Sequence, residues 1–292
     1  MATLKQIRRR LTSVRNTQKI TRAMKLVATA KLRRAQENMT RAKPYAKRLR
    51  KMIWDVSERS GEDAHRLLEV REEKKALLIV ITSDRGMCGA FNSNINKRAE
   101  KYLRENENGH EQVALALLGR KGRDYFRRRP YSIDKEYMEV LSAPSFESVC
   151  KIGDEIKARY LDGNLDAVYI VYNEFKSAMS QNVVVERFLP IIPERDSDES
   201  ANPELEGIEF AFEPTMELVL DSVLPLYINV RLYFAVLESL AAEMGARMTA
   251  MEAATENAGE LLTKLTMQYN KARQAMITNE MLEIVSGAEA LK

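Results

Sequence analysis

The two ends of the chain strongly favour long helices. Residues 3–43 contain neither Pro nor Gly, and residues 226–286 contain no Pro and only two Gly. A helix of roughly 60 residues rises about 90 Å, which exceeds the span of a compact domain. Because such a helix projects from any domain, it needs a partner to be stable. The other long helix of the same chain is the partner that the sequence offers.

Apolar and small residues recur with a helical period in both segments. The steps alternate between three and four residues, which keeps one face of each helix along a common stripe. The stripe comprises Ile7, Leu11, Val14, Thr17, Thr21, Met24 and Ala28 in the first segment, and Leu237, Leu240, Met244, Met248, Met251, Ala254, Ala258, Leu261 and Leu265 in the last. The stripes predict that the terminal helices pair as a slender coiled coil.

The charge is distributed unevenly along the chain. Residues 1–51 contain seventeen Lys or Arg and one acid, Glu37, whereas the remaining residues contain 29 basic and 41 acidic side chains. A basic arm of this kind indicates an acidic partner, which could be nucleic acid, a membrane surface or a protein. No aromatic residue for base stacking precedes Tyr45, and the apolar face lacks the bulky residues of a membrane-binding helix. An acidic protein surface around the helices is the better explanation.

The sequence also limits where the protein works. Cys88 and Cys150 form no pattern, which indicates a reducing compartment. No apolar run approaches the roughly 20 residues that a membrane span needs, and the N-terminus lacks the apolar region of a secretory signal. The N-terminal arginines would suit a mitochondrial transit peptide, but the same stretch carries the apolar stripe. We therefore expect a bacterial protein that faces the cytoplasm.

The middle of the chain predicts a small α/β domain, because continuous apolar runs alternate with helical segments. Strands are expected over residues 76–82, 113–118, 167–172 and, paired antiparallel at an edge, 181–189. One helix is expected to run to about Leu103 with Asn92 or Ser93 as its N-cap, and another from Ser145 to Tyr160. Together with the terminal helices, this predicts a mixed α+β or α/β chain with a long coiled coil.

Four segments follow from this reading. They are an N-terminal coiled-coil helix at 1–60, an α/β domain at 75–190, an acidic surface loop at 191–213 and a C-terminal coiled-coil helix at 214–292. Pro214 suits the first turn of the last helix. Pro225 should kink or restart that helix, and Pro44 should do the same in the first one.

The loop at residues 83–92 follows the first strand, where a doubly wound sheet binds a phosphate or nucleotide. It contains Asp84, Gly86 and Gly89, but it has neither a G-x-G-x-x-G motif nor the lysine of a P-loop. The alternative is that the glycines shape a tight turn, and we favour it. A nucleotide-using enzyme remains a possible reading, which binding of a nucleotide by residues 75–190 would support.

Other catalytic groups are poorly placed. Cys88 could act as a nucleophile only with a base in reach, and the histidines, His65 and His110, lie in charged stretches where we expect them to be solvated. Two isolated cysteines and two isolated histidines do not make a metal site. We therefore predict no catalytic residue, no cofactor and no metal.

Three stretches of the chain resemble the gamma subunit of the F-type ATP synthase, the central rotor shaft. They are residues 7–28 with the run SVRNTQKITRAMKLVA, residues 83–92 (SDRGMCGAFN), and residues 246–258 (ARMTAMEAATENA) together with 269–280 (YNKARQAMITNE). Their order and spacing hold over nearly the whole chain. The resemblance implies an antiparallel coiled coil inside a ring of three alpha and three beta subunits. It also implies a Rossmann-like domain that binds the epsilon subunit and the membrane c-ring.

The resemblance implies roles for particular residues as well. It assigns contacts with the beta subunits to Lys19, Arg22 and Met24, and near the tip to Arg273, Gln274 and Thr278. It places ATP chemistry on the beta subunits, so this chain would be non-catalytic. Residues 193–206 lack the cysteine pair of the redox-regulated chloroplast members, which argues against thiol control.

The resemblance also implies a location and an alternative to test. The complex would lie peripherally on the cytoplasmic face of the bacterial plasma membrane, reach the membrane only through its other subunits, and translocate protons or sodium ions. The alternative function is a basic coiled-coil protein that binds nucleic acid, whose affinity would fall steeply with salt.

Overall fold

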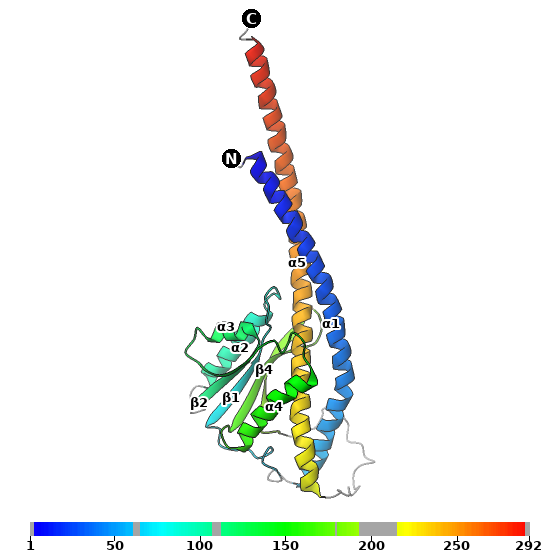
Figure 1. The fold of residues 1–292 in the computed structure, drawn as a ribbon, viewed down its shortest axis with the longest axis vertical. Coiled ribbons are helices and arrows are strands. Elements are labelled where there is room, and N and C mark those ends of the chain that lie inside the picture. The colour runs from blue at the N-terminus through cyan, green and yellow to red at the C-terminus, as the bar shows by residue number, and fades with distance from the viewer. Residues whose placement is uncertain (1–2, 61–64, 107–111, 179, 193–214, 290–292) are drawn as a thin grey trace. The chain divides into compact units, whose positions relative to one another are not determined.

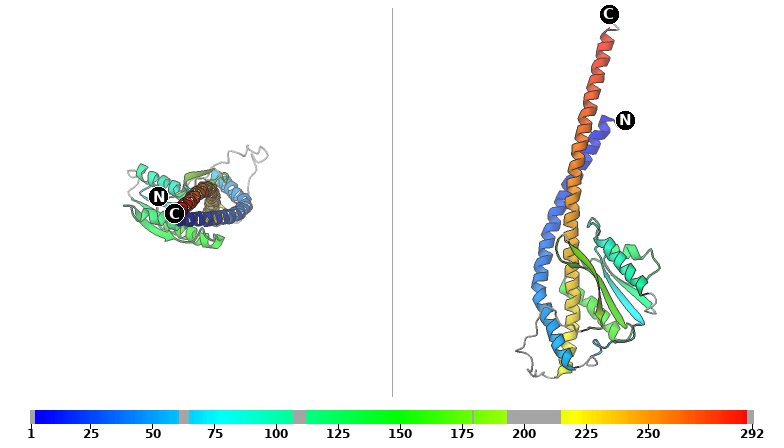
Figure 2. Two further views of the ribbon diagram at one scale, coloured as in Figure 1. Left: turned by 90° about the horizontal axis from the view of Figure 1, so that it is seen from above. Right: turned by 180° about the vertical axis from the view of Figure 1, so that it is seen from behind.

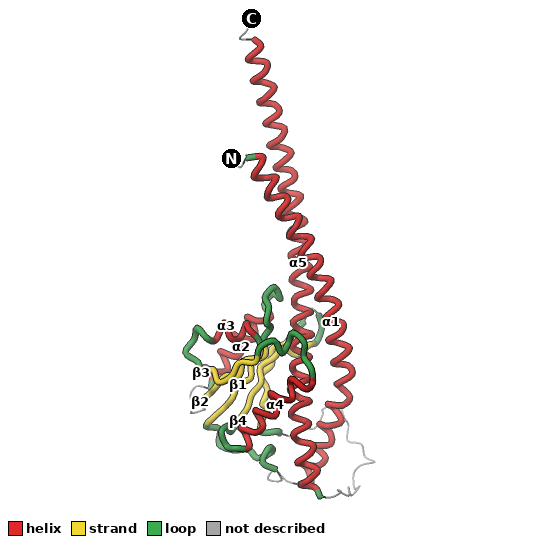
Figure 3. The backbone as a smooth tube through the Cα atoms, viewed as in Figure 1, coloured by secondary structure: helices red, strands yellow, loops and turns green. Residues whose placement is uncertain are grey.

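The computed structural model describes residues 3–60, 65–106, 112–178, 180–192 and 215–289. The chain divides into two compact units, one formed by residues 1–29 with 247–292 and the other by residues 30–246. Two long helices, α1 (Leu4–Ser60) and α5 (Met216–Glu289), each contribute to both units (Figure 1). The unit of residues 30–246 also contains the sheet and the shorter helices, which Figure 3 distinguishes by colour.

Both long helices pass through a proline without ending, which corrects the expected restart at Pro44 and Pro225. A proline inside a helix removes one hydrogen bond and costs about 3 kcal/mol. Large apolar side chains on both sides of Pro225, including Leu224 and Ile228, are buried in one hydrophobic cluster. Burying each such side chain contributes about 1.5–3 kcal/mol, so the packing outweighs the lost bond.

Five strands form one sheet in the order β3-β2-β1-β4-β5. They are β1 (Lys75–Ile81), β2 (Gln112–Leu118), β3 (Ser132–Tyr137), β4 (Ala167–Phe175) and β5 (Gln181–Leu189). The first four are mutually parallel, and β5 pairs antiparallel with β4 at the edge, as the sequence predicted. After the exposed Lys75, β1 is apolar and buried at the centre of the sheet, as a strand covered on both faces requires.

Three shorter helices flank the sheet: α2 (Phe91–Glu105), α3 (Arg120–Phe126) and α4 (Phe146–Leu161). α4 and the first part of α5 pack on one face, in a cluster with alternate side chains of β1 and β4. α2 packs on the opposite face with the remaining side chains of β1. The result is a three-layer arrangement with a Rossmann-like strand order (Figures 1 and 2).

The ends of these helices test the capping predictions. The helix expected to begin at Ser145 is α4, and Ser145 caps it in a reciprocal capping box with Ser148. The prediction that Asn92 or Ser93 caps α2 is wrong, because α2 begins at Phe91 after Ala90, without a side-chain cap. Asn92 instead lies inside the first turn of α2, where its side-chain oxygen accepts a hydrogen bond from the backbone of Ser83 in the preceding loop.

Two elements were missed in the sequence. α3 has seven residues and β3 is mostly polar, with the run SIDKEY. Neither has a clear apolar period, because β3 is an edge strand and α3 is short. The expected acidic loop at 191–213 and the helix start at Pro214 lie almost wholly outside the described residues. The proposed boundaries of the four segments therefore remain predictions.

α5 is more apolar than the sequence reading allowed. It contains an 18-residue stretch with a mean hydropathy of 1.4, enough by length and composition for a membrane span, and 44% of that stretch is buried inside the protein. The buried residues of α5 that pack against the sheet, such as Leu224, Ile228 and Leu232, explain this composition. The core helix of a soluble domain has the same character.

Candidate functional site

In the unit of residues 1–29 and 247–292, α1 and α5 lie side by side and run antiparallel (Figures 1 and 2). The hydroxyl of Thr255 lies 2.7 Å from that of Thr21, and Lys25 forms an ion pair with Glu252. Residue numbers therefore rise along one helix as they fall along the other. We call this part of the structure the helical pair.

The helical pair buries residues at intervals of seven. Ile7, Thr21 and Ala28 are buried on α1, and Met251, Ala258 and Leu265 are buried on α5. Two members of the predicted stripe are exposed instead, namely Thr17 and Leu261, and their neighbours Gln18 and Leu262 turn inward. At these two points the stripe advances by four residues where three were predicted. The sequence alone does not distinguish the two steps, because both keep a residue near the same helix face.

α5 continues past the first residue of α1 (Figure 1). Its last turns carry large apolar side chains that are exposed: Met276, Ile277, Met281, Leu282, Ile284 and Val285. Single exposed apolar residues are ordinary, but a group of six on one terminal segment marks an interaction surface. We call residues 273–289 the terminal extension.

The residues assigned to contacts with beta lie in two places on the helical pair. Lys19 and Arg22 are exposed and line a groove of about 470 Å³ between the helices, together with Glu252 and Glu256. Met24 is half-buried and so packs partly within the pair. On the terminal extension, all three assigned residues are exposed: Arg273, Gln274 and Thr278.

The two helices of the pair differ sharply in charge. Residues 1–29 contain eight Lys or Arg and no acid, whereas residues 247–292 contain five basic and six acidic residues. One side of the pair is therefore strongly basic and the other is close to neutral. A partner that surrounds the pair meets a different electrostatic surface on each side.

The loop at residues 83–92 is filled by its own side chains. The carboxylate of Asp84 accepts a hydrogen bond from the backbone N–H of Arg120 at 3.1 Å, at the start of α3, and another from Ser142 at 3.1 Å. The side-chain oxygen of Asn92 accepts from the backbone N–H of Ser83 at 2.9 Å. These bonds use the polar groups that a nucleotide phosphate would otherwise contact.

The loop glycines have different roles. Gly89 has a φ of +56°, a conformation that glycine adopts without strain, so it shapes the turn. Gly86 needs no special φ, and a Cβ there would meet the Lys121 side chain only at an ordinary 3.9 Å. α5 packs against this loop, because Ala242 and Ala246 belong to the same hydrophobic cluster as Cys88. The arrangement favours the structural reading of the loop.

The candidate nucleophile, Cys88, and the candidate base, His65, make structural contacts and not those of a catalytic pair. Cys88 is buried, with Asn92 Nδ2 3.1 Å from its sulfur. His65 is not solvated as expected: its side chain is 14% exposed, and its Nε2 lies 3.1 Å from Asp221. Its Nδ1 accepts from the backbone N–H of Leu67. His110 lies outside the described residues. Within the described ranges, no cluster of His, Cys, Asp or Glu has the geometry of a metal site.

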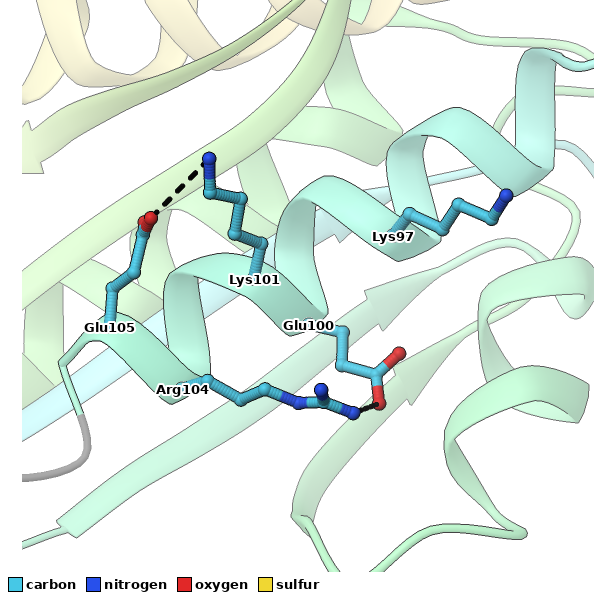
Figure 4. A pocket seen from close by; sticks show the side chains of 5 residues that line it. All are labelled: Lys97, Glu100, Lys101, Arg104 and Glu105. Atoms are coloured by element: carbon cyan, nitrogen blue, oxygen red, sulfur yellow. Dashed lines mark hydrogen bonds and ion pairs between the residues drawn. The ribbon is translucent and has the colours of Figure 1, made fainter.

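A second pocket lies on the outer face of α2 (Figure 4). Its five lining residues are all charged and all come from α2: Lys97, Glu100, Lys101, Arg104 and Glu105. Ion pairs join Arg104 to Glu100 at 2.7 Å and Lys101 to Glu105 at 3.5 Å. The pairs at one-turn spacing are those of a solvated helix face.

Two buried acids on α5, Glu238 and Glu243, were not found from the sequence. Glu238 on α5 is 9% exposed, and burial raises its pKa to about 7. The nearby carboxylates Glu174 and Glu186 raise the pKa further, whereas Tyr172 and Lys43 lower it. The apolar run that contains Glu238 and Glu243 was the one available signal, because an acid within such a run is expected to be buried.

Comparison with known proteins settles the family. The family model described as ATP synthase matches residues 3–291. The ATP synthase gamma chain of Anaeromyxobacter sp. (strain Fw109-5) is 47% identical over 295 residues, and that of Geobacter metallireducens is 45% identical over 292 residues. Each comparison covers 100% of both chains.

The chain belongs to the ATP synthase gamma chain family.

Two solved structures share the fold of this chain. A chain of the Euglena gracilis mitochondrial ATP synthase (OSCP/F1/c-ring) has a TM-score of 0.68 and 22% identity, covering 99% of this chain and 94% of its own length. A chain of the Tetrahymena thermophila mitochondrial ATP synthase (central stalk/c-ring) has a TM-score of 0.59 and 24% identity, covering 80% and 99%. At these identities the likeness shows the fold alone.

Proposed function

We propose that this chain is the central rotor shaft of an F-type ATP synthase and that it contributes no catalytic side chain. The observation that carries the proposal is the helical pair, with its basic α1 segment beside a nearly neutral α5 segment. Full-length identity of 43–47% with gamma chains supports it. A shaft needs such a difference between its sides.

The mechanism follows from that difference. ATP chemistry takes place on the beta subunits, and each rotation step presents a new face of the helical pair to each of them. A ligand shifts a conformational equilibrium only through its different affinity for the two states. The shaft acts as that ligand, so that rotation and the state of each catalytic site are coupled in both directions.

Several weak contacts share the coupling. The residues that we propose to contact beta are Lys19, Arg22, Met24, Arg273, Gln274 and Thr278. Five of them are exposed, and an exposed ion pair contributes only about 0.2–1 kcal/mol. Steric contact of the stiff pair with the surrounding subunits therefore supplies most of the torque, and polar contacts define the resting angles.

The proposal includes partners and a location. Three alpha and three beta subunits surround the helical pair, and the unit of residues 30–246 binds the epsilon subunit and the c-ring. The complex is a peripheral assembly on the cytoplasmic face of the bacterial plasma membrane and translocates protons or sodium ions. Neither nucleic acid nor a cofactor takes part in the work of this chain.

Co-expression with candidate alpha and beta subunits tests the proposal. Size exclusion and an ATPase assay, with and without this chain, measure whether a complex forms and whether its steady turnover needs the chain. A stable complex with chain-dependent turnover is the expected result. No complex, together with nucleic acid retained in a salt-sensitive manner, would overturn the proposal in favour of the basic coiled-coil alternative.

A further inference from the structure

Five polar side chains meet across the helical pair, of which Thr21 is buried and the other four are half-buried. They lie on consecutive turns of the two helices and comprise Gln18, Thr21, Lys25, Glu252 and Thr255. Buried apolar residues precede and follow them on both helices, such as Ile7 and Ala28 on α1. We call this group the polar clamp.

The polar clamp links the helices through three contacts. The hydroxyls of Thr255 and Thr21 lie 2.7 Å apart, so one donates to the other. Each also lies near a carbonyl of its own helix, Met251 at 2.7 Å from Thr255 and Gln18 at 3.1 Å from Thr21. The side-chain amide of Gln18 donates to the backbone carbonyl of Thr255 at 3.4 Å. Lys25 forms its ion pair with Glu252 one turn away. Thr21 is 8% exposed, so the central contact is largely shielded from water.

Within residues 3–29 and 247–289, the apolar part of the stripe fits more than one register. On α5 the buried residues Met251, Ala258 and Leu265 repeat every seven positions, and on α1 the buried Ile7 and Ala28 lie three heptads apart with the half-buried Val14 between them. A slip of one heptad therefore keeps mainly apolar side chains opposite one another. Such a slip moves one helix by about 10 Å along the other. It would place Thr21 opposite Leu262 or Met248, and Glu252 opposite Gln18 or Leu32. All three contacts of the polar clamp would then be lost.

We propose that the polar clamp fixes the register of the helical pair and thereby decides which exposed side chains of α1 and α5 stand side by side. A polar residue at one core position of a coiled coil specifies register at some cost in stability. The consequence for coupling rests on the proposed function, since a slipped shaft would present a different surface to its ring. The register itself does not depend on that function.

Replacement of the two threonines by valine is the direct test. Thr21→Val with Thr255→Val keeps the side-chain shape and removes the hydroxyl contact. The matched control is Thr17→Val with Thr263→Val, because both residues are exposed and each hydroxyl bonds a carbonyl of its own helix. The rescue variant is Thr21→Ser with Thr255→Ser, which keeps a hydroxyl at both positions.

Disulfide cross-linking in the full-length chain reports the register. Leu11→Cys with Leu265→Cys probes the native register, because each position lies ten residues from the contact of Thr21 with Thr255. Leu11→Cys with Ala258→Cys, or with Ala272→Cys, probes a slip of one heptad in either direction. Single-cysteine variants correct for the native cysteines, neither of which lies on α1 or α5.

The expected results separate register from general stability. The parent, the exposed-threonine control and the serine variant should form the native cross-link. In the parent, the native register is favoured over the slipped one by the hydroxyl contact. The valine pair lacks this contact in both registers, so the yield of the slipped cross-link should rise about tenfold. Its melting temperature should not fall, since apolar residues pack well at core positions. A valine pair that forms only the native cross-link would overturn the proposal, as would a parent that lacks the native cross-link.

The ratio of ATP-driven ion pumping to ATP hydrolysis, measured in reconstituted complex, tests the consequence for coupling. The valine pair should lower this ratio, while the control and the serine variant keep the parent value. A slipped variant with an unchanged ratio would overturn the link from register to coupling. A parent complex whose hydrolysis does not depend on this chain would overturn the proposed function instead, and the cross-linking result would still decide the register.

Discussion

The side-chain oxygen of Asn229 occupies the space that a side chain at position 153 would need. A Cβ on Gly153 would lie 2.2 Å from Asn229 Oδ1, and Asn229 Nδ2 donates to Asp154 at 3.1 Å. α4 and α5 therefore approach closely at this point, where α4 keeps a glycine in its interior. Glycine inside a helix costs about 0.5–1 kcal/mol of helix stability, but at position 153 it allows α4 and α5 to approach closely.

Gly153→Ala should therefore destabilise the unit of residues 30–246. Overpacking a tight contact costs about 1–3 kcal/mol, which exceeds the gain in helix propensity of about 1 kcal/mol. Denaturant titration of the full-length chain measures the loss as a lower midpoint. Gly287→Ala is the matched control, because nothing lies within 4 Å of its Cβ position, and it should leave stability equal or slightly higher. Equal midpoints for the two variants would contradict the steric explanation.

Glu238 should make stability fall as the pH rises. Its folded pKa of about 7 exceeds its ordinary value of 4.5, so the folded state binds the proton more tightly than the unfolded chain. Its contribution is therefore fully present below pH 4.5 and is lost as the pH rises through 7. The difference corresponds to about 3 kcal/mol at most, since one pKa unit is about 1.4 kcal/mol.

Glu238→Gln isolates this effect. The variant should show a smaller loss of stability between pH 5 and pH 8 than the parent, and it should be more stable than the parent at pH 8. Glu174→Gln should act in part, because it removes one of the charges that raise the pKa of Glu238. Urea midpoints at both pH values measure the change. Parallel pH profiles for the parent and Glu238→Gln would exclude a buried, titrating acid here.

Asp84 should behave as a structural residue. Asp84→Ala removes two hydrogen bonds, to the backbone of Arg120 and to Ser142, and should lower stability by about 1 kcal/mol. The affinity of the full-length chain for ATP or ADP, measured by calorimetry, should be negligible in parent and variant alike. Saturable binding that disappears in Asp84→Ala would instead establish a nucleotide site in the loop.

Arg273→Ala should leave assembly intact and weaken coupling only partly. The side chain is exposed on the terminal extension, where a single ion pair contributes about 0.2–1 kcal/mol. ATP-driven ion pumping in a purified, fully assembled complex is the measurement. Complete loss of pumping in such a complex would mean that one polar contact carries the coupling.

The predicted elements succeeded where the apolar pattern was long. The strands around Leu78, Leu117 and Ile170 lie in the buried sheet as expected, because continuous apolar runs suit a sheet covered on both faces. β3 and α3 failed because a short or edge element buries too few side chains to show a period. Of the candidate site residues, Lys19 and Arg22 share a groove, while Asp84 proved to be part of a turn.

Residue order alone was enough to predict the two long helices, the parallel strands and the resemblance to the gamma subunit family. These follow from local periodicity and from residue order, which need no knowledge of distant contacts. The tertiary structure alone decided whether Gln18 or Thr17 turns inward, how the helix passes Pro225, and that Glu238 is buried beside other carboxylates. Each of these depends on side chains far away in the chain, because packing across elements, and not local propensity, sets their free energy.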